Sequence, residues 1–503
     1  MTDAIGDGGR GMTPKGAASG GPGSVIGGPG RVKAVVGLLV VFELVSGFLQ
    51  GSAPALLPAV QDWQSISTAE AQWFTAIQFL AAAVSVPVFG RLGDLHGHRR
   101  LIRISLACIT VGALLVAVAP NLAVLLLGRM LMGPLAALLP LEIGLVRGRL
   151  DLEGGRRAVG LLVGALTLGS LLGHGLAGPL LHVTGDIQVT LWALAALACG
   201  CLALSYCGVP ESPSRAEGRM DWAGTVLLGL ALVLFLGTVS RGASWGWASP
   251  LTLSGLLLAA VLMAWWVRIE RDRPHALVDV RAVAGRRVAP YYVSGFVFGA
   301  VMLGGQAVAI SYLAASPSDE GYGFGLATWE ISMWGGVPHV LAFIGASIVA
   351  RVAARTGYRR TLLFAFALMA AGSAGLMATH AVLPLFALSF AVAGFGMGLA
   401  MGGLPTVIVE GSAEDRTASA TAVYNNLKTL GGSVAGAGAS VVLGALVVDG
   451  TEVPALSAYL TFWGLGAVLC VLALALQAVT ARQADGEGSE SGIRSSAAVL
   501  NRP

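Results

Sequence analysis

The chain has 503 residues, of which 55% are hydrophobic and 12% are charged, and its formal net charge is +4. This composition is too apolar for a soluble multidomain protein, and the chain is too long for a single membrane anchor. We therefore expect an all-α polytopic membrane protein without a nucleic-acid partner, because the basic residues cluster in short loops. The five cysteines lie inside apolar runs, so we expect neither disulfides nor a metal site.

In chain order, fourteen segments have the roughly twenty residues that a helix needs to cross a bilayer. Their expected limits are 33–57, 71–90, 100–119, 122–148, 157–182, 188–209, 222–240, 251–269, 288–315, 327–350, 361–379, 381–409, 417–448 and 456–480. Residues 1–32 and 481–503 are rich in small and polar side chains, so we expect disordered tails there and no cleaved signal peptide.

The distribution of positive charge indicates the orientation of these spans. With a cytoplasmic N-terminus, 28 of the 31 Lys and Arg residues fall in inner segments, and only Arg241 falls in an outer loop. Arg129 and Lys428 lie within spans. This asymmetry follows the positive-inside rule and predicts a plasma (inner) membrane protein with both termini in the cytoplasm.

A polar stretch between the second and third expected spans is repeated later in the chain. It carries two glycines, one acid and a basic pair, which are Gly90, Asp94, Gly97, Arg99 and Arg100. The stretch 350–360 has the same spacing, with Gly357 in place of Gly97 and Ala354 in place of Asp94. The repeat predicts two related six-helix halves with two extra spans between them. The expected domains are 33–210, 211–287 with the two extra spans, and 288–480.

The stretch Gly90 to Arg100 resembles the loop motif of the major facilitator superfamily. Residues 129–133 resemble the fourth-span motif of proton-coupled members, with Met132 where Gln is usual. Residues 169–178 resemble the fifth-span antiporter motif, with His174 at the position of a proline. The two extra spans, the outer loop 245–247 and the stretch 425–432 resemble the fourteen-span drug:proton antiporter branch.

This resemblance implies a major facilitator fold with 14 transmembrane helices and proton-driven efflux of drugs, antibiotics or natural products by alternating access. The implied partners are a hydrophobic or amphipathic small molecule and the lipid bilayer, the proton is the coupling ion, and we expect a monomer without a bound cofactor. A proton-coupled nutrient symporter and a non-transporting membrane sensor or scaffold are the alternatives. We expect no enzyme and no ATP-driven pump, since the chain lacks the common catalytic and nucleotide-binding motifs.

Asp94 is the expected centre of a conformational latch. Its carboxylate at a helix-linking turn can accept hydrogen bonds at the positive N-terminal end of a neighbouring helix, and Arg99 or Arg100 can neutralise it. In the family that neighbour is the penultimate span, which here begins near Thr417. The alternative is a solvated turn that only sets topology. Because Ala354 replaces the acid in the second copy, we expect an asymmetric latch.

Ionisable residues inside the spans are the candidates for proton coupling, because a buried charge needs a partner, a proton or a water-filled cavity. They are Glu43, Arg129, Glu142, His174, His339 and Lys428. The family's first-span acid would fall near Leu49, and the nearest acid is Glu43. Glu43 is a proton or substrate-cation site, or a structural acid. Arg129 and Glu142 are too far apart along one helix to pair, and Lys428 either faces Glu43 or reaches the inner surface.

Two further sets of residues complete the expected site. The candidate cavity wall consists of Tyr291, Tyr292, Gln306, Trp329, Met333, Trp334, Asn425 and Asn426. Aromatic, amide and thioether side chains suit hydrophobic ligands if they point inward, whereas some of them would otherwise face lipid. The candidates for close helix packing or a hinge are Gly169, Gly173, Gly178 and Pro179.

Overall fold

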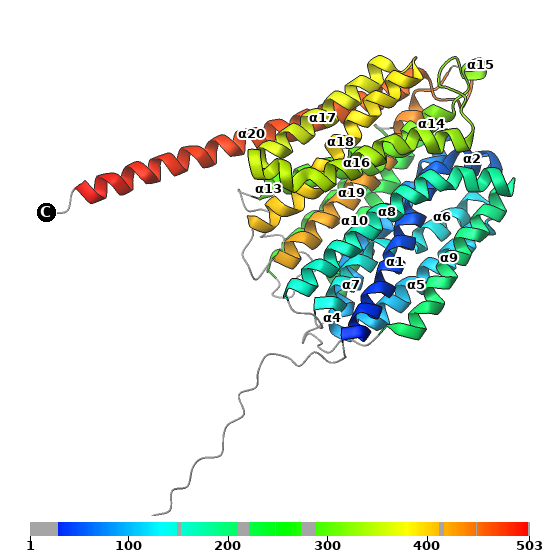
Figure 1. Cartoon of the computed structure of the whole chain (residues 1–503). Coiled ribbons are helices and arrows are strands. Elements are labelled where there is room, and N and C mark those ends of the chain that lie inside the picture. The colour runs from blue at the N-terminus through cyan, green and yellow to red at the C-terminus, as the bar shows by residue number, and fades with distance from the viewer. Residues whose placement is uncertain are drawn as a thin grey trace, which may run out of the picture.

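The computed structural model describes residues 29–147, 152–209, 221–246, 248–272, 288–411, 417–448 and 450–500. Within these residues the secondary structure is helical, apart from one isolated bridge between Val447 and Pro454. The helices run side by side, and the second half of the chain packs against the first (Figure 1). This architecture confirms the expected all-α class.

The first half of the bundle extends from α1 to α9. The bounds are α1 Pro29–Ala55, α2 Leu57–Gln64, α3 Thr68–Ala71, α4 Trp73–His96, α5 His98–Ala117, α6 Leu122–Leu131, α7 Leu135–Arg147, α8 Leu152–Thr184 and α9 Ile187–Gly208. Helices α1 and α8 are the most extensively packed pair, and α5 packs along α9. The apolar core of this half contains Phe42 from α1, Ile102 from α5 and Leu138 from α7, all of them buried.

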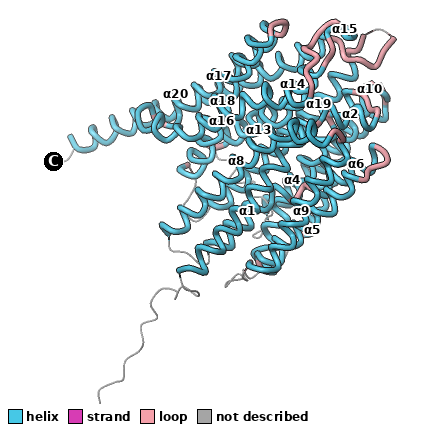
Figure 2. The backbone as a smooth tube through the Cα atoms, turned by 45° about the vertical axis from the view of Figure 1, so that its right-hand side comes forward, coloured by secondary structure: helices cyan, strands magenta, loops and turns pink. Residues whose placement is uncertain are grey.

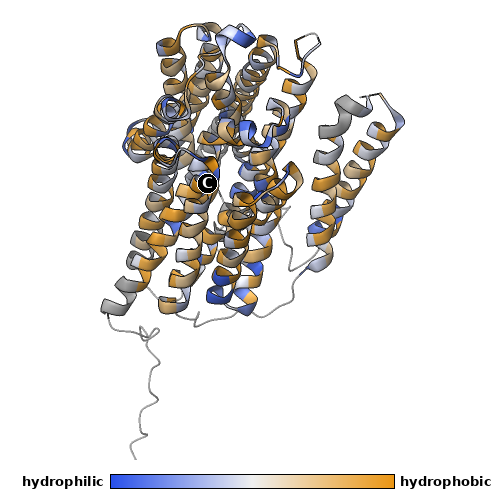
Figure 3. Cartoon of the chain, turned by 90° about the vertical axis from the view of Figure 1, so that its right-hand side faces the viewer, coloured by the Kyte–Doolittle hydropathy of each residue, from blue (hydrophilic) through white to orange (hydrophobic). Residues whose placement is uncertain are grey.

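Two helices, α10 (Trp222–Trp245) and α11 (Pro250–Asp272), form a hairpin at the side of the bundle (Figure 3). Leu228 of α10 and Trp266 of α11 share an apolar cluster with Leu80 of α4 and Ala437 of α19. The hairpin therefore contacts helices from both halves. The expected domain boundaries at 210 and 287 lie outside the described residues.

The second half of the bundle follows the hairpin. The bounds are α13 Ala289–Gly299, η1 Ala300–Gly304, α14 Gly305–Ala314, α15 Pro317–Glu320, α16 Thr328–Thr356, α17 Tyr358–Thr379, α18 Leu383–Glu410, α19 Thr417–Ala445 and α20 Leu456–Leu500. Its core contains Phe298 from α13, Phe366 from α17 and Leu404 from α18. The loops around α15 lie at one end of the bundle, which we call the α15 end (Figure 2).

Thirteen helices in the described part of the chain are long and apolar enough to cross a membrane. They correspond to thirteen of the fourteen expected spans. The remaining expected span, 417–448, forms the 29-residue helix α19, in which Asn, Thr, Ser and Gly replace many large apolar residues. The fourteen-span count is therefore consistent with the helices that form.

Two of the expected continuous spans are interrupted. The span 122–148 divides into α6 and α7 at Gly133 and Pro134, because Pro134 has no N–H to donate to the preceding turn. The span 288–315 contains the π-helical segment η1 between α13 and α14. A Cβ on Gly304 at the end of η1 would lie 2.3 Å from the Cβ of Ala435, so glycine allows η1 to approach α19 closely. The hydropathy of these two spans therefore predicts where they lie but not where their helices are interrupted.

The C-terminal segment differs from the expectation. Residues 481–503 were expected to be disordered, whereas α20 continues to Leu500 and extends beyond the bundle (Figure 1). Helix formation is cooperative, so the helix that begins in the apolar span continues into the tail in spite of Gly486, Gly488 and Gly492, which are poor helix formers. The expected tail 1–32 lies outside the described residues up to residue 28, and α1 already begins at Pro29.

The repeated polar stretch forms the same turn twice. Gly97 ends α4 and begins α5 at φ 98°, and Gly357 ends α16 and begins α17 at φ 81°. Each glycine N–H donates to the carbonyl four residues earlier, on Gly93 and Ala353. Residues that carry a Cβ rarely adopt such φ values, so glycine is required at both turns. The structure thus contains the duplication that the spacing indicates.

Candidate functional site

Two carboxyl groups from different helices meet inside the first half. Glu43 on α1 and Glu142 on α7 are both completely buried, and their carboxyl groups interact with each other. Cys201 on α9 lies close enough to interact with Glu142. None of the four carboxyl oxygens has a hydrogen-bond partner of standard geometry among the described residues. Two like charges at this position would be very costly, so the pair is suited to hold a proton.

Arg129 lies in the last turn of α6 and is 4% exposed. Its Nε donates to the Phe74 carbonyl oxygen at 2.9 Å, and its guanidinium carbon lies 4.3 Å from the centroid of the Phe74 ring. The Met132 sulfur lies 3.7 Å from Arg129 Nη1. These contacts fix Arg129 against α4. As expected, Arg129 and Glu142 have separate partners.

A second cluster joins the two halves of the molecule. The rings of His174 on α8 and His339 on α16 stack with centroids 4.5 Å apart. Gln306 Nε2 on α14 lies 3.3 Å from His174 Nδ1 and 2.8 Å from His339 Nε2, and His339 Nδ1 lies 3.2 Å from the Gly335 carbonyl oxygen. Because an amide nitrogen donates, both facing ring nitrogens are acceptors in this arrangement. A small cavity of about 30 Å³ adjoins Gln306 and His339.

The two halves also touch each other near the α15 end. The N–H of Gly178 on α8 donates to Ser332 Oγ on α16 at 3.0 Å. Ser433 Oγ on α19 donates to the Ala76 carbonyl oxygen on α4 at 3.1 Å. Gln72 and Ser311 form a third contact, with Gln72 Nε2 donating to Ser311 Oγ at 3.1 Å. These three bonds join elements close to where α4 and α16 begin, so they hold the halves together at the α15 end.

The expected packing glycines lie where α8 meets its neighbours. A Cβ on Gly169 would lie 2.1 Å from the Leu44 carbonyl oxygen, and one on Gly173 would lie 2.1 Å from the Phe48 carbonyl oxygen. Both contacts are with α1, and Gly178 faces α16 as described above. Pro179 lies inside the helical span of α8. The α8 backbone therefore passes between α1 and α16 at distances that only glycine permits.

The latch residues lie at the opposite end of the bundle. The Asp94 side chain is 51% exposed, and its Oδ1 lies 3.3 Å from His98 Nε2. His98 packs against the α7 backbone, since a Cβ on Gly144 would lie 2.1 Å from His98 Nε2. Arg99 is half-buried and Arg100 exposed. His98 was not among the residues that the sequence pattern indicated. Contact between Asp94 and the beginning of α19 stays a prediction, because the side chains there lie outside the described set.

The remaining candidates lie mainly on the second half. Lys428 Nζ donates to Asn425 Oδ1 at 3.2 Å and lies 5.9 Å from the Tyr424 ring centroid, so its described contacts are within α19. Asn426 Oδ1 is buried without a partner in the described part of the chain. The aromatic and thioether candidates divide by exposure. Tyr291 and Tyr292 are buried, Trp334 is partly buried, and Trp329 and Met333 are 40% and 61% exposed.

Comparison with known proteins assigns the family. Residues 39–221 and 221–436 match the family model of the Major Facilitator Superfamily. The chain belongs to the Major Facilitator Superfamily. This membership and the apolar helices identify an integral membrane transporter of small molecules. The earlier expectations about family and fold are therefore confirmed.

Relatives of this Major Facilitator Superfamily member include two Streptomyces proteins. The "Probable actinorhodin transporter" of Streptomyces coelicolor is 27% identical over 84% of this chain and 74% of the relative. The "Tetracenomycin C resistance and export protein" of Streptomyces glaucescens is 27% identical over 78% of this chain and 72% of the relative. A solved POT family transporter, PepTSo, has the same fold, with a TM-score of 0.67, 15% identity and coverage of 91% of this chain and 98% of that chain.

Proposed function

We propose that the protein is a proton-driven exporter of hydrophobic or amphipathic small molecules, of the drug:proton antiporter branch. The observation that carries the proton coupling is the buried Glu43–Glu142 pair, which has no cationic partner among the described residues. The class of cargo is supported by the relatives named for actinorhodin transport and for tetracenomycin C resistance and export, and the second of these names supports the direction.

The carboxyl pair can act as the proton carrier for an electrostatic reason. A single charge near the bilayer centre costs about 2.5 to 3.5 kcal/mol on insertion scales, and a second like charge adds repulsion. Each proton that binds removes one of these buried charges, so burial favours the protonated forms of Glu43 and Glu142. When a conformational change brings water to α1 and α7, a proton is released on that side. Alternating access then converts proton movement into net transport.

The His174–Gln306–His339 cluster links this carrier to the substrate path. Its three side chains come from both halves, so moving α8 away from the second half breaks the contact between Gln306 and His174, whereas Gln306 and His339 stay together. Gly173 on α8 contacts Phe48 on α1, five residues after Glu43, and His174 is the next residue. A change at Glu43 is thus transmitted along the α1–α8 contact to the interface between the halves.

Everted membrane vesicles test this function. An imposed inside-acid gradient should drive accumulation of an exported compound, found first by screening growth of a sensitive host against a compound library. Glu43→Gln and Glu142→Gln should each reduce this accumulation to the level of vesicles without the protein, while folding is preserved. Asp319→Asn, which alters an exposed acid near α15, serves as the matched control and should behave as wild type.

Two outcomes would contradict the proposal. Unchanged gradient-driven accumulation in both glutamine variants would remove the carboxyl pair from the mechanism. Proton-coupled movement of the compound in the opposite direction, or no movement across a broad panel, would replace export by uptake or by a non-transporting role.

A further inference from the structure

Lys428 is a cation inside the bundle that the proton carrier does not use. The chain contains three lysines, of which Lys15 and Lys33 precede or begin the first span and Lys428 lies on α19. Lys428 follows Thr417, the first residue of α19, by eleven residues, which corresponds to about 16 Å along the helix. A lysine side chain is shorter than this distance, so its amine stays within the bundle.

The positive charge of Lys428 has no negative partner among the described residues. Its Nζ donates to the neutral amide oxygen of Asn425 at 3.2 Å and lies 5.9 Å from the Tyr424 ring centroid. No described carboxylate forms an ion pair with it, and the acids Glu43 and Glu142 interact with each other in the first half. An ammonium group has three N–H donors, so two of them are available. A charge inside a membrane protein is normally paired, and here the partner must come from outside the described chain.

The backbone at Lys428 is held firmly in place. A Cβ on Gly299 of α13 would collide with the Lys428 carbonyl oxygen, and a Cβ on Gly431 of α19 would collide with the Phe296 carbonyl oxygen. Helix α19 is therefore packed against α13 directly at this residue. Lys428 itself is only partly buried, so a ligand can reach its side chain. A fixed backbone with an accessible amine is a preorganised site for an anion.

The site lies on the side of the interface that faces away from the closed α15 end. Helix α19 runs toward that end, because Pro454, which accepts a hydrogen bond from Tyr322 next to α15, pairs with Val447 just after α19. The bond that Ser433 donates to α4 holds the halves together five residues nearer to the α15 end than Lys428. A ligand at Lys428 is thus shielded from the α15 end by this contact and approaches from the opposite end.

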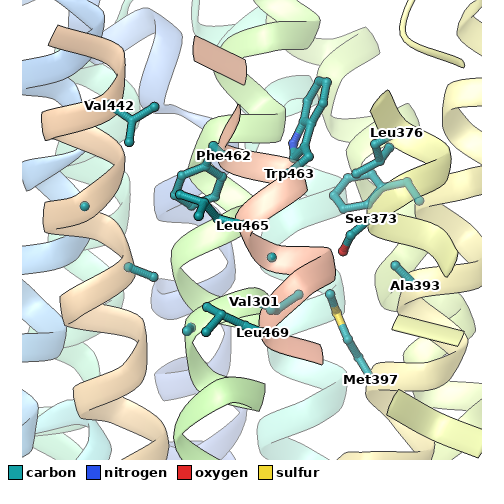
Figure 4. A pocket seen from close by; sticks show the side chains of 16 residues that line it. Val301, Ser373, Leu376, Ala393, Met397, Val442, Phe462, Trp463, Leu465 and Leu469 are labelled. Atoms are coloured by element: carbon teal, nitrogen blue, oxygen red, sulfur yellow. The ribbon is translucent and has the colours of Figure 1, made fainter. Parts of the chain in front are cut away.

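The apolar cavity of the second half is a separate space (Figure 4). It has a volume of about 170 Å³, Gly438 and Val442 of α19 contribute to its wall, and no Asp, Glu, Lys or Arg lines it. The close contact between Gly431 and Phe296 lies between this cavity and Lys428 along α19. The cavity therefore supplies no counter-charge, and recognition of an anion depends on Lys428.

We propose that Lys428 binds the carboxylate of an amphipathic acid, with Asn425 orienting the amine. The proposal rests on the export function and deepens it by naming the acidic members of the cargo class. The lysine ammonium is a compact point charge, which suits contact with one carboxylate oxygen. A neutral cargo would leave the charge uncompensated, and a cationic cargo would be repelled.

The test compares two probes of nearly the same shape, 2-naphthoate and 2-naphthamide, which differ in charge at neutral pH. Equilibrium dialysis against the purified full-length protein in phosphatidylcholine nanodiscs measures both affinities without a proton gradient, and empty nanodiscs give the background from the lipid. Naphthoate should bind more tightly by about 10- to 100-fold, the ratio that a hydrogen bond to a charged group gives. Solid-state NMR, with isotope labels on lysine Nζ and on the naphthoate carboxyl carbon, should detect direct contact between the two atoms.

Three variants assign the contact to one residue. Lys428→Gln should remove both the preference for naphthoate and the NMR contact, and loss of an unpaired buried charge should not harm folding. Lys428→Arg retains the charge and should retain the preference. Lys33→Gln removes the same charge near the beginning of α1, is the matched control and should bind as wild type.

Three results would overturn the proposal. They are equal affinities of wild type for the two probes, a preference that persists in Lys428→Gln, and complete displacement of naphthoate by physiological chloride, which would assign the site to an inorganic anion. Because binding needs no gradient, intact naphthoate binding together with absent transport would contradict the export function alone.

Discussion

At the scale of single residues, Gly178 determines how closely α8 approaches α16. Its N–H donates to Ser332 Oγ, and an added Cβ would lie 2.3 Å from the Thr328 carbonyl oxygen and 2.4 Å from Ser332 Oγ. The first of these atoms belongs to the backbone and cannot rotate away. A side chain at residue 178 must therefore push the two helices apart.

We predict that Gly178→Ala lowers the free energy of unfolding by about 1 to 3 kcal/mol, the usual cost of overpacking. Separation of α8 from α16 should also increase labelling of a cysteine introduced at Ser332. Gly175→Ala on the same helix is the control, because its Cβ would meet no atom within 4 Å and should be neutral or slightly stabilising. Equal thermal stability of the two variants would contradict the close contact.

Gln306 is a second residue that holds the two halves together. Its amide nitrogen serves both histidines, so Gln306→Met keeps the length of the side chain and leaves His174 Nδ1 and His339 Nε2 without a partner. We predict a loss of about 1 to 3 kcal/mol in thermal unfolding experiments, the cost of buried unsatisfied groups. Gln50→Met, which removes an amide that bonds to Ser46 on the same helix, should cost less. A larger effect at Gln50 would argue against the cluster.

At the scale of elements, the turn between α4 and α5 and its copy between α16 and α17 have one geometry and different chemistry. Gly97 and Gly357 adopt the same unusual φ region, whereas the acid is present only in the first turn. Asp94 contacts His98, the first residue of α5. The common backbone explains the conserved spacing within the chain, and the difference predicts an asymmetric role.

We predict that Asp94→Asn strongly impairs transport, because it removes the charge that can bind at the end of a neighbouring helix. Ala354→Asp, which restores the acid to the second turn, should not rescue it. Initial transport rates in vesicles at matched protein levels measure both effects. Full activity of Asp94→Asn would reduce the turn to a topological signal.

At the scale of the whole molecule, the bonds between the halves that hold the α15 end together come from three helix pairs. The same end must open if the transporter is to expose its centre to both sides of the membrane in turn. The hairpin of α10 and α11 packs beside this interface on helices of both halves. In the proposed cycle, the structure is therefore the state that is closed at the α15 end.

We predict that a covalent link across this end stops the cycle. Gln72→Cys combined with Ser311→Cys leaves a gap between the two thiols, because the longer glutamine side chain now reaches Ser311 Oγ at 3.1 Å, so a short reducible cross-linker with two thiol-reactive ends is used to join them. The cross-linker should abolish transport, and a reducing agent should restore it. Each single variant, treated in the same way, controls for the five native free cysteines. Transport that continues in the cross-linked double variant would show that this end does not need to open.

The sequence by itself determined the class, the positions of the spans and the duplicated turn. These features depend on local hydropathy, on the distribution of charge and on glycine spacing, all of which are properties of neighbouring residues. It also singled out Glu43 and His174 as buried ionisable groups. It did not predict the interruption at η1 or the helical continuation to Leu500, because packing and cooperative propagation decide them.

Only the tertiary structure decided which of these groups meet. Glu43 and Glu142 are about a hundred residues apart in the chain, and His174, Gln306 and His339 come from three helices. No periodicity within one helix specifies its neighbours, since each apolar face can pack against several others. The buried carboxyl pair and the cluster that joins the halves therefore result from the packing of distant helices.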